Sequence, residues 1–313
     1  MAQRLACGRL PGLGRPSPIR PRFLPLLLVL PTFIVLLAIT IFPLLYTATL
    51  TVFSWELTTK ASAQFVALGN FGRILFEDGR FWNAMRNTTL LVVVGVGLQV
   101  ILGTGLALLV NRLRRGRTLI VSLILIPVMI APVVAGFQFR MIYNDQFGPL
   151  NDIIQFLTGG LWRGIAWLAD PSVALIAILI ADVWQWTPFM ILIVLAGLQA
   201  IPDELHEAAR VDGASARQQV WHISLPLVLP VIVVGILVRM MDTFKLFDIV
   251  YQLTAGGPGS TTETIAYYTY LQGFKFFSLG YTAAMAVIQL IVITIVAKIF
   301  LGYQKRMQRR GSL

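Results

Sequence analysis

The chain has 313 residues, of which 57% are hydrophobic and only 12% are charged. Because soluble domains average about 45–50% apolar and about 25% charged residues, this composition excludes an ordinary water-soluble globule. The 25 Lys and Arg residues outnumber the 14 Asp and Glu residues, for a net charge of +11, and their places along the chain indicate a membrane protein rather than a nucleic-acid-binding one.

Long apolar runs recur along the chain, and about 20 apolar residues suffice for a helix to cross the hydrocarbon of a bilayer. Four runs without a charged residue cover residues 23–50, 87–111, 118–139 and 276–297. Two further runs contain charges: 171–199 includes Asp182, and 218–247 includes Arg239, Asp242 and Lys245. We therefore predict an all-α polytopic membrane protein with about six transmembrane helices, the fifth being the least regular.

Basic residues gather at the two ends of the chain and in the short segment after the second run. They are Arg4, Arg9, Arg15, Arg20 and Arg22 before the first run, Arg112, Arg114, Arg115 and Arg117 after the second, and Lys305, Arg306, Arg309 and Arg310 near the C-terminus. By the positive-inside rule these segments are cytoplasmic, so both termini are predicted to be cytoplasmic. The first run exceeds the about 7–15 apolar residues of a signal peptide, which predicts an uncleaved first helix.

Motifs for chemistry are missing from the sequence. It contains no Gly-Lys dipeptide, and therefore no phosphate-binding loop of the G-x-x-x-x-G-K-[ST] type. Its two histidines, His206 and His222, are too far apart for a helical zinc site, and Cys7 is its only cysteine. We therefore predict no catalytic residue, no metal site and no cofactor in this chain, so that it is not an enzyme and any ATP is bound by a partner.

The segment between the fourth and fifth runs, about residues 200–226, is the one long polar connection on the predicted cytoplasmic side. Pro202 suits a first helical turn, and Asp203 and Glu204 suit the positive end of a helix dipole. Gly213 ends or bends this helix, and a second helical piece leads to Pro226, where the regular pattern breaks. Two short helices joined at a glycine are therefore predicted along the membrane face.

This loop resembles a known family. Glu207-Ala208-Ala209, Gly213, Ile223 and Leu225-Pro226 reproduce the E-A-A-x3-G-x9-I-x-L-P signature of the permease subunits of binding-protein-dependent ABC importers. Further residues resemble the carbohydrate-uptake branch of that family, of the maltose and glycerol-3-phosphate type. They are Trp186-Thr187-Pro188-Phe189, Ala196-Gly197-Leu198-Gln199, Val211-Asp212-Gly213-Ala214, Phe247-Asp248 and Leu253-Thr254-Ala255-Gly256-Gly257-Pro258.

The resemblance implies a type-1 permease fold and a domain organisation. Expected are a basic cytoplasmic tail at 1–22, a first transmembrane helix at 23–50, an external loop at 51–85, a five-helix permease domain at 86–303 that contains the loop, and a basic cytoplasmic tail at 304–313. The implied location is the bacterial or archaeal plasma membrane. The implied partners are the lipid bilayer, a second and distinct permease, two cytoplasmic ATPases and an extracytoplasmic solute-binding protein, with no nucleic acid.

In such permeases the loop is a coupling helix that seats in a cleft of the ATPase. By resemblance, Glu207 would meet a basic group of the ATPase, Ala208 and Ala209 would allow close approach, and Gly213 would provide the bend. The remaining implied coupling residues are Asp212, Ala214, Ile223, Leu225 and Pro226. The alternative is that the charges of this loop form an ordinary solvated face.

Charged residues within the apolar runs indicate the substrate path, because a charge at mid-membrane costs about 2.5–3.5 kcal/mol on insertion scales and usually faces a cavity or a partner. Helical spacing places two groups on two faces: Asp182, Gln185, Trp186 and Phe189, and Arg239, Asp242 and Thr243. Such polar and aromatic walls suit a sugar. The alternative is that Arg239 and Asp242 form a structural ion pair and that Trp184 and Trp186 only pack.

The predicted function is half of the translocation pathway of an ABC importer for a sugar or sugar-derived solute. Two other hypotheses stay open at this point. One is a stand-alone proton-coupled carrier that uses Asp182 or Asp242 as its proton site, and the other is an intramembrane enzyme.

Overall fold

The computed structural model describes residues 24–58, 62–113, 115–161 and 164–311. The basic tail predicted at 1–22 lies outside the described residues, as do the last two residues of the tail predicted at 304–313. The chain divides into two compact units, Met1–Thr49 and Leu50–Leu313. The described residues of the first unit belong to helix α1 (Leu24–Leu50). This helix contains Pro31 and Pro43, and transmembrane helices tolerate proline.

Five helices in the described part of the chain are long and apolar enough to cross a membrane, which confirms five of the six predicted runs as helices. They are α1, the segment Gly79–Asn111, α9 (Ala174–Gln199), the segment Ala216–Thr243 and the first part of α15 (Leu279–Gly311). The second comprises α3 (Gly79–Leu90), a π-helical turn η1 (Leu91–Gly95) and α4 (Val96–Asn111).

The run at 118–139 is not the single helix that was predicted. It forms α5 (Arg117–Ile124), α6 (Ile126–Met129) and α7 (Pro132–Ile142). Proline lacks an N–H group and disfavours helical geometry in the residue before it, and Ala131, just before Pro132, has an extended ψ of 137°. A membrane crossing by this broken segment stays a prediction.

The fifth run, by contrast, is more continuous than predicted. The short α11 (Ala216–Gln219) passes through a π-helical turn, η2 (Val220–Ser224), into α12 (Leu225–Thr243) without a break. Pro226 lacks the N–H group for a helical bond, and the π-helical turn just before it is the kind of local adjustment by which membrane helices accommodate a proline. The break predicted at Pro226 was therefore wrong, and the third run, not the fifth, is the least regular.

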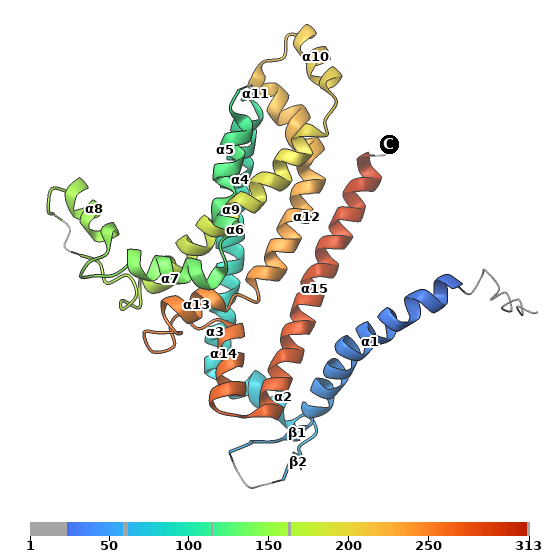
Figure 1. Ribbon diagram of the computed structural model, residues 1–313, viewed down its shortest axis with the longest axis vertical. Helices are drawn as coiled ribbons and strands as arrows, with labels where there is room; N and C mark the ends of the chain where they lie inside the picture. The colour runs from blue at the N-terminus through green and yellow to red at the C-terminus, as the bar shows by residue number, and fades with distance from the viewer. Residues whose placement is uncertain (1–23, 59–61, 114, 162–163, 312–313) are drawn as a thin grey trace, which may run out of the picture. The chain divides into compact units, whose positions relative to one another are not determined.

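The connections form the two ends of the second unit (Figure 1). At one end lies α10 (Asp203–Val211), and at the other lie the antiparallel strands β1 (Phe53–Ser54) and β2 (Gln64–Phe65) with α2 (Gly69–Phe76). The helix α8 (Pro149–Leu157) follows α7. After α12 come α13 (Asp248–Leu253), α14 (Ile265–Tyr270) and the π-helical turn η3 (Leu271–Lys275), which precede α15.

Helices α4 and α9 approach each other closely, and this contact positions the polar residues described below. A Cβ atom on Gly103 of α4 would lie 2.6 Å from the Cβ of Met190 on α9, so only glycine permits this approach. Ile191, Val194 and Leu198 of α9 belong to a buried apolar cluster with residues of α4 and α12. The three helices α4, α9 and α12 thus form one packed layer, in which a buried polar side chain needs a partner from a neighbouring helix.

Candidate functional site

Arg239 of α12 is the centre of a buried polar network. Its guanidinium is 1% exposed and donates hydrogen bonds to Gln99 Oε1 (2.9 Å), Asp242 Oδ2 (2.5 Å) and Thr243 Oγ1 (3.0 Å). It also reaches both carboxylate oxygens of Asp182 on α9 at 3.4 Å. Its Cζ atom also lies over the Trp186 ring, 4.4 Å from the ring centroid. This buried charge therefore has polar partners on α4, α9 and α12 and an aromatic partner on α9.

Asp182 is as deeply buried as Arg239, at 1% exposure. Gln99 Nε2 donates to its Oδ2 atom at 2.8 Å, so Gln99 bridges the carboxylate and the guanidinium. Gln99 lies on α4 and was not among the predicted site residues, because an amide in an apolar run gives no signal of its own. The network therefore connects α4, α9 and α12. Removing either Asp182 or Arg239 would leave the other charge buried without a partner, which is costly.

Asp242 differs from Asp182 in being open to its surroundings. Its side chain is 51% exposed although one oxygen binds Arg239. Trp186 and Phe189 are half-buried, and their rings meet edge to face at 6.4 Å. Asp242, Trp186 and Phe189 are thus the predicted path residues that keep accessible surface, whereas Asp182, Arg239 and Thr243 are sealed within the network.

Gln185 takes a different role from the one predicted for it. Its side chain is fully buried and donates from Nε2 to the backbone oxygen of Ile130 at 2.8 Å, at the break before α7. Its Oε1 atom has no hydrogen-bond partner among the described residues. Gln185 therefore joins α9 to the broken third run instead of contributing to the Arg239 network.

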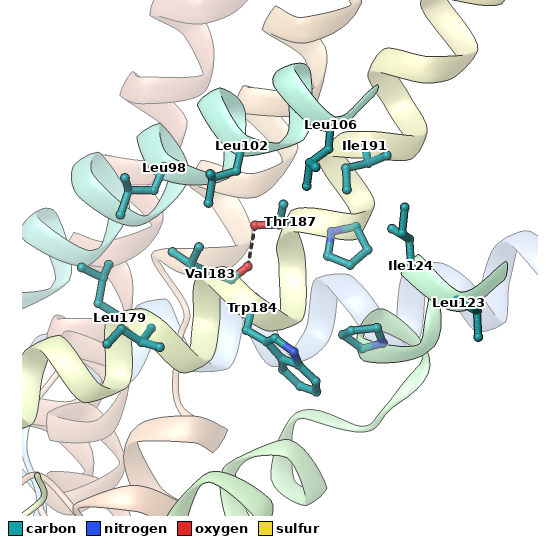
Figure 2. Close-up of a pocket in the computed structure, with 13 residues that line it drawn as sticks. Leu98, Leu102, Leu106, Leu123, Ile124, Leu179, Val183, Trp184, Thr187 and Ile191 are labelled. Carbon is teal, nitrogen blue, oxygen red and sulfur yellow. Dashed lines mark hydrogen bonds between the residues drawn. The ribbon is translucent and has the colours of Figure 1, made fainter. Parts of the chain in front are cut away.

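An apolar pocket of about 450 Å³ lies on the other side of α9, between α4 and the α5–α6 segment (Figure 2). Leucines of α4 and α5 line it with Trp184 and Pro188 of α9. The one hydroxyl that faces it, Thr187 Oγ1, donates to Val183 O at 2.6 Å. Because its lining is almost entirely apolar, this pocket does not suit a sugar. Thr187 and Pro188 line this pocket, whereas Trp186 belongs to the polar network around Arg239.

The loop with the family signature is exposed. None of the residues of α10 is buried, and the Glu207 and Arg210 side chains, with atoms 3.8 Å apart, are mostly in contact with solvent. Val211 is 88% exposed, which is unusual for valine in a folded protein. The predicted coupling residues Ala208, Asp212 and Pro226 are exposed as well, whereas Ala209, Ala214, Ile223 and Leu225 are half-buried.

Local hydrogen bonds hold the shape of this exposed loop. Gly213 has φ +80° and ends α10, with Ala214 N donating to Ala209 O at 2.8 Å. The next helix starts with a capping box, in which Ser215 and Gln218 satisfy each other's backbone N–H groups. The loop is therefore well defined without any covering partner, and the predicted bend at Gly213 is present.

A second polar cluster at the opposite end of the unit was missed by the sequence analysis. Asp78 caps α3 through Phe81 N, and its other oxygen accepts hydrogen bonds from Tyr268 (2.8 Å) and Tyr281. Burial raises the pKa of Asp78, but these hydrogen bonds lower it more, so the net pKa is below its usual range. Burial, followed by the bond to Asp78, raises the pKa of Tyr268 to about 12.

Comparisons with known proteins show the family of this chain. Residues 99–310 match the model of the family described as "Binding-protein-dependent transport system inner membrane component". The trehalose/maltose transport system permease protein MalF of Thermococcus litoralis is 36% identical over 279 residues, which are 89% of this chain and 92% of that protein. The sulfoquinovosyl glycerol transport system permease protein SmoG of Agrobacterium fabrum is 34% identical over 94% of both chains.

A solved structure gives the same fold. The crystal structure of a bacterial ABC transporter involved in the import of the acidic polysaccharide alginate contains a chain that matches with a TM-score of 0.80, at 22% identity, over 92% of this chain and 97% of that one. The family match covers more than half of the sequence and the relatives span nearly all of it. The chain belongs to the family of inner-membrane permease components of binding-protein-dependent ABC importers, as a multi-pass membrane protein.

Proposed function

We propose that this permease takes up a sugar or sugar-derived solute and forms half of the translocation pathway, beside a second, distinct permease. Two cytoplasmic ATPases would bind the ATP, and an extracytoplasmic binding protein would deliver the solute. The names of the relatives, which include trehalose, maltose and sulfoquinovosyl glycerol permeases, support a sugar.

The observation that carries this proposal is the exposed carboxylate of Asp242 beside half-buried aromatic rings. Asp242 is fixed by Arg239 through one oxygen, and its side chain is still 51% exposed. A carboxylate accepts hydrogen bonds from sugar hydroxyls, and a ring such as Trp186 packs on the apolar face of a sugar. Asp242, Trp186 and Phe189 are therefore the substrate contacts of this subunit, and the Arg239 network sets their positions.

Family membership favours an importer over a stand-alone proton-coupled carrier. The geometry argues against Asp182 as a carrier's proton site, because such a site must exchange with water and this carboxylate is enclosed by Arg239 and Gln99. The exposed Asp242 is tested by transport instead. The permease alone in liposomes should therefore move no maltose or trehalose under a proton gradient. Uptake of either sugar should need ATP, the ATPase, the second permease and the binding protein.

Coupling to the ATPase is assigned to α10 and the turn at Gly213. A helix that exposes Val211 and whose ends are held by local hydrogen bonds is suited to seat in a cleft without losing shape. The test is purification of the complex from native membranes with Glu207→Arg, and with Asp152→Arg on the exposed α8 as a matched charge-reversal control.

The ATPase should be lost from the Glu207→Arg complex and retained by the Asp152→Arg complex. Retention of the ATPase at wild-type levels in both, with normal uptake, would contradict the assignment of the coupling loop.

A further inference from the structure

Beyond the sites predicted from the sequence, five aromatic rings of α13, α14 and the adjoining turns form one continuous cluster. Phe247 stacks on Tyr251 (5.5 Å between centroids) and meets Tyr270 edge to face (5.1 Å), and Tyr270 stacks on Phe274 (5.5 Å). Tyr267, only 5% exposed, lies behind them at 6.1 Å from Phe247. Two separate stretches of the chain thus build one aromatic surface.

This surface is open on one side. Tyr251 is 44% exposed and Phe274 is 69% exposed, whereas Phe247 and Tyr270 are half-buried. The hydroxyl groups of Tyr251 and Tyr270 make no hydrogen bond with any described residue. Rings that offer both a free face and a free hydroxyl group suit a ligand that has apolar faces and polar edges.

Charged side chains flank the rings. Lys245 and Lys275 are exposed and Asp248 is half-buried, and within the described ranges none of the three forms an ion pair. Unpaired charges are costly against lipid, and the cores of protein interfaces are depleted of charge. The surroundings therefore favour a hydrated ligand over lipid tails or a subunit interface.

We propose that Phe247, Tyr251, Tyr270 and Phe274 form an aromatic platform that stacks the rings of the incoming sugar before it reaches Asp242. This proposal rests on the proposed sugar substrate. Phe247 lies just beyond the end of α12, the helix that carries Asp242, so the platform starts close to this substrate contact along the chain. Its role is to hold a released sugar inside the importer while the pathway changes its opening.

The test uses the complete importer in proteoliposomes, with maltose and trehalose as probes and with ATP hydrolysis measured alongside uptake. The variant is Tyr251→Ala with Phe274→Ala, which removes the two most exposed rings of the cluster. Tyr251→Phe with Phe274→Tyr keeps both rings. Phe76→Ala, which removes an 86% exposed ring of α2, is the matched control.

The double alanine variant should move about three- to tenfold less sugar per ATP hydrolysed. Its rate of ATP hydrolysis with the loaded binding protein should stay at the wild-type level, because the ATPase contact is elsewhere. The ring-retaining variant and Phe76→Ala should transport as the wild type does. A merely structural role of the rings would lower ATP hydrolysis and uptake together.

Wild-type uptake per ATP in the double alanine variant would overturn the platform and leave the proposed function intact. Loss of the second permease from the purified variant would make the surface a subunit interface and would also overturn it. If the wild-type importer itself moves neither sugar, the proposed substrate class fails, and the platform fails with it.

Discussion

The guanidinium of Arg239 on α12 lies over the Trp186 ring on α9, with Cζ 4.4 Å from the ring centroid. Asp182 approaches the same guanidinium from its edge, so two side chains of α9, four residues apart, hold one charge of α12. Each of the three residues consequently depends on the other two for its position. Substitutions of the buried charges should therefore lower stability, whereas substitution of the exposed Asp242 should lower transport.

Arg239→Leu should destabilise the permease by about 3–5 kcal/mol, because it leaves the carboxylate of Asp182 buried without its charge partner. The measurement is thermal unfolding of the purified complex in detergent. The double substitution of Arg239→Leu with Asp182→Leu removes both charges and should recover most of the lost stability. A double variant as unstable as Arg239→Leu alone would argue against the pair as the cause.

Asp242→Asn should lower sugar uptake by about tenfold or more, because hydrogen bonds to a charged group are worth about 1.5–3 kcal/mol. Its melting temperature should change little, since this side chain is half exposed. Asp182→Asn should show the reverse pattern, with a lower melting temperature as the main effect. Equal effects of both substitutions on uptake and melting would remove the distinction between the two carboxylates.

Gly213→Ala should weaken the coupling of uptake to ATP hydrolysis. No atom lies within 4 Å of the position of a new Cβ, so the effect comes from the backbone, whose φ of +80° costs an L-residue about 1–2 kcal/mol. Gly213→Asn is the control, because asparagine tolerates this conformation better. ATP hydrolysis stimulated by the loaded binding protein should fall for alanine more than for asparagine, and the opposite order would contradict the strain.

The Asp78 cluster should make stability depend on pH at both extremes. The pKa of Asp78 is lowered below its ordinary value of 3.8, so its contribution is complete above pH 3.8 and is lost as the pH falls through the lowered pKa. The pKa of Tyr268 is raised to about 12 from 10.0, so its contribution is complete below pH 10 and is lost as the pH rises towards 12.

Melting of the purified complex should therefore be unaffected by this cluster between about pH 4 and pH 10. Asp78→Ala should lower the melting temperature within that range, because it removes the helix cap of α3 and leaves two tyrosine hydroxyl groups without an acceptor. Tyr268→Phe should reduce the loss of stability above pH 10. An unchanged alkaline profile in Tyr268→Phe would assign that loss to other groups.

Much of the fold follows from composition and spacing alone. Apolar length predicts α1, α4, α9, α12 and α15, because the hydrocarbon thickness of the bilayer sets the length of its helices. The same argument fails for the run at 118–139, because hydropathy does not report the conformational effect of Pro127 and Pro132. The loop at Gly213 was predictable because glycine, helix-capping residues and family spacing all lie close together in the sequence.

The site was only partly predictable. Periodicity places Asp182 and Trp186 on one face and Arg239 and Asp242 on another, and these two faces do meet. It could not tell which carboxylate is sealed and which is open, because that depends on packing between helices. Gln99 and the aromatic platform were not predicted for the same reason. Gln99 pairs with Asp182, 83 residues away, and Phe247 meets Tyr270 of a different helix.

The π-helical turn Val220–Ser224 has a consequence for how the loop and the network face each other. Leu225 N–H bonds to Val220 O, so this turn contains one residue more than a turn of α-helix. The turn takes up this residue as a bulge, so Leu225 stands to Val220 as the fourth residue on would stand in an α-helix. Each residue of an α-helix advances by about 100° around the axis, so the same five residues wound as α-helix would rotate the loop by about 100° relative to Arg239. The π-helical turn thus sets the direction in which the exposed loop points when Arg239 faces Asp182.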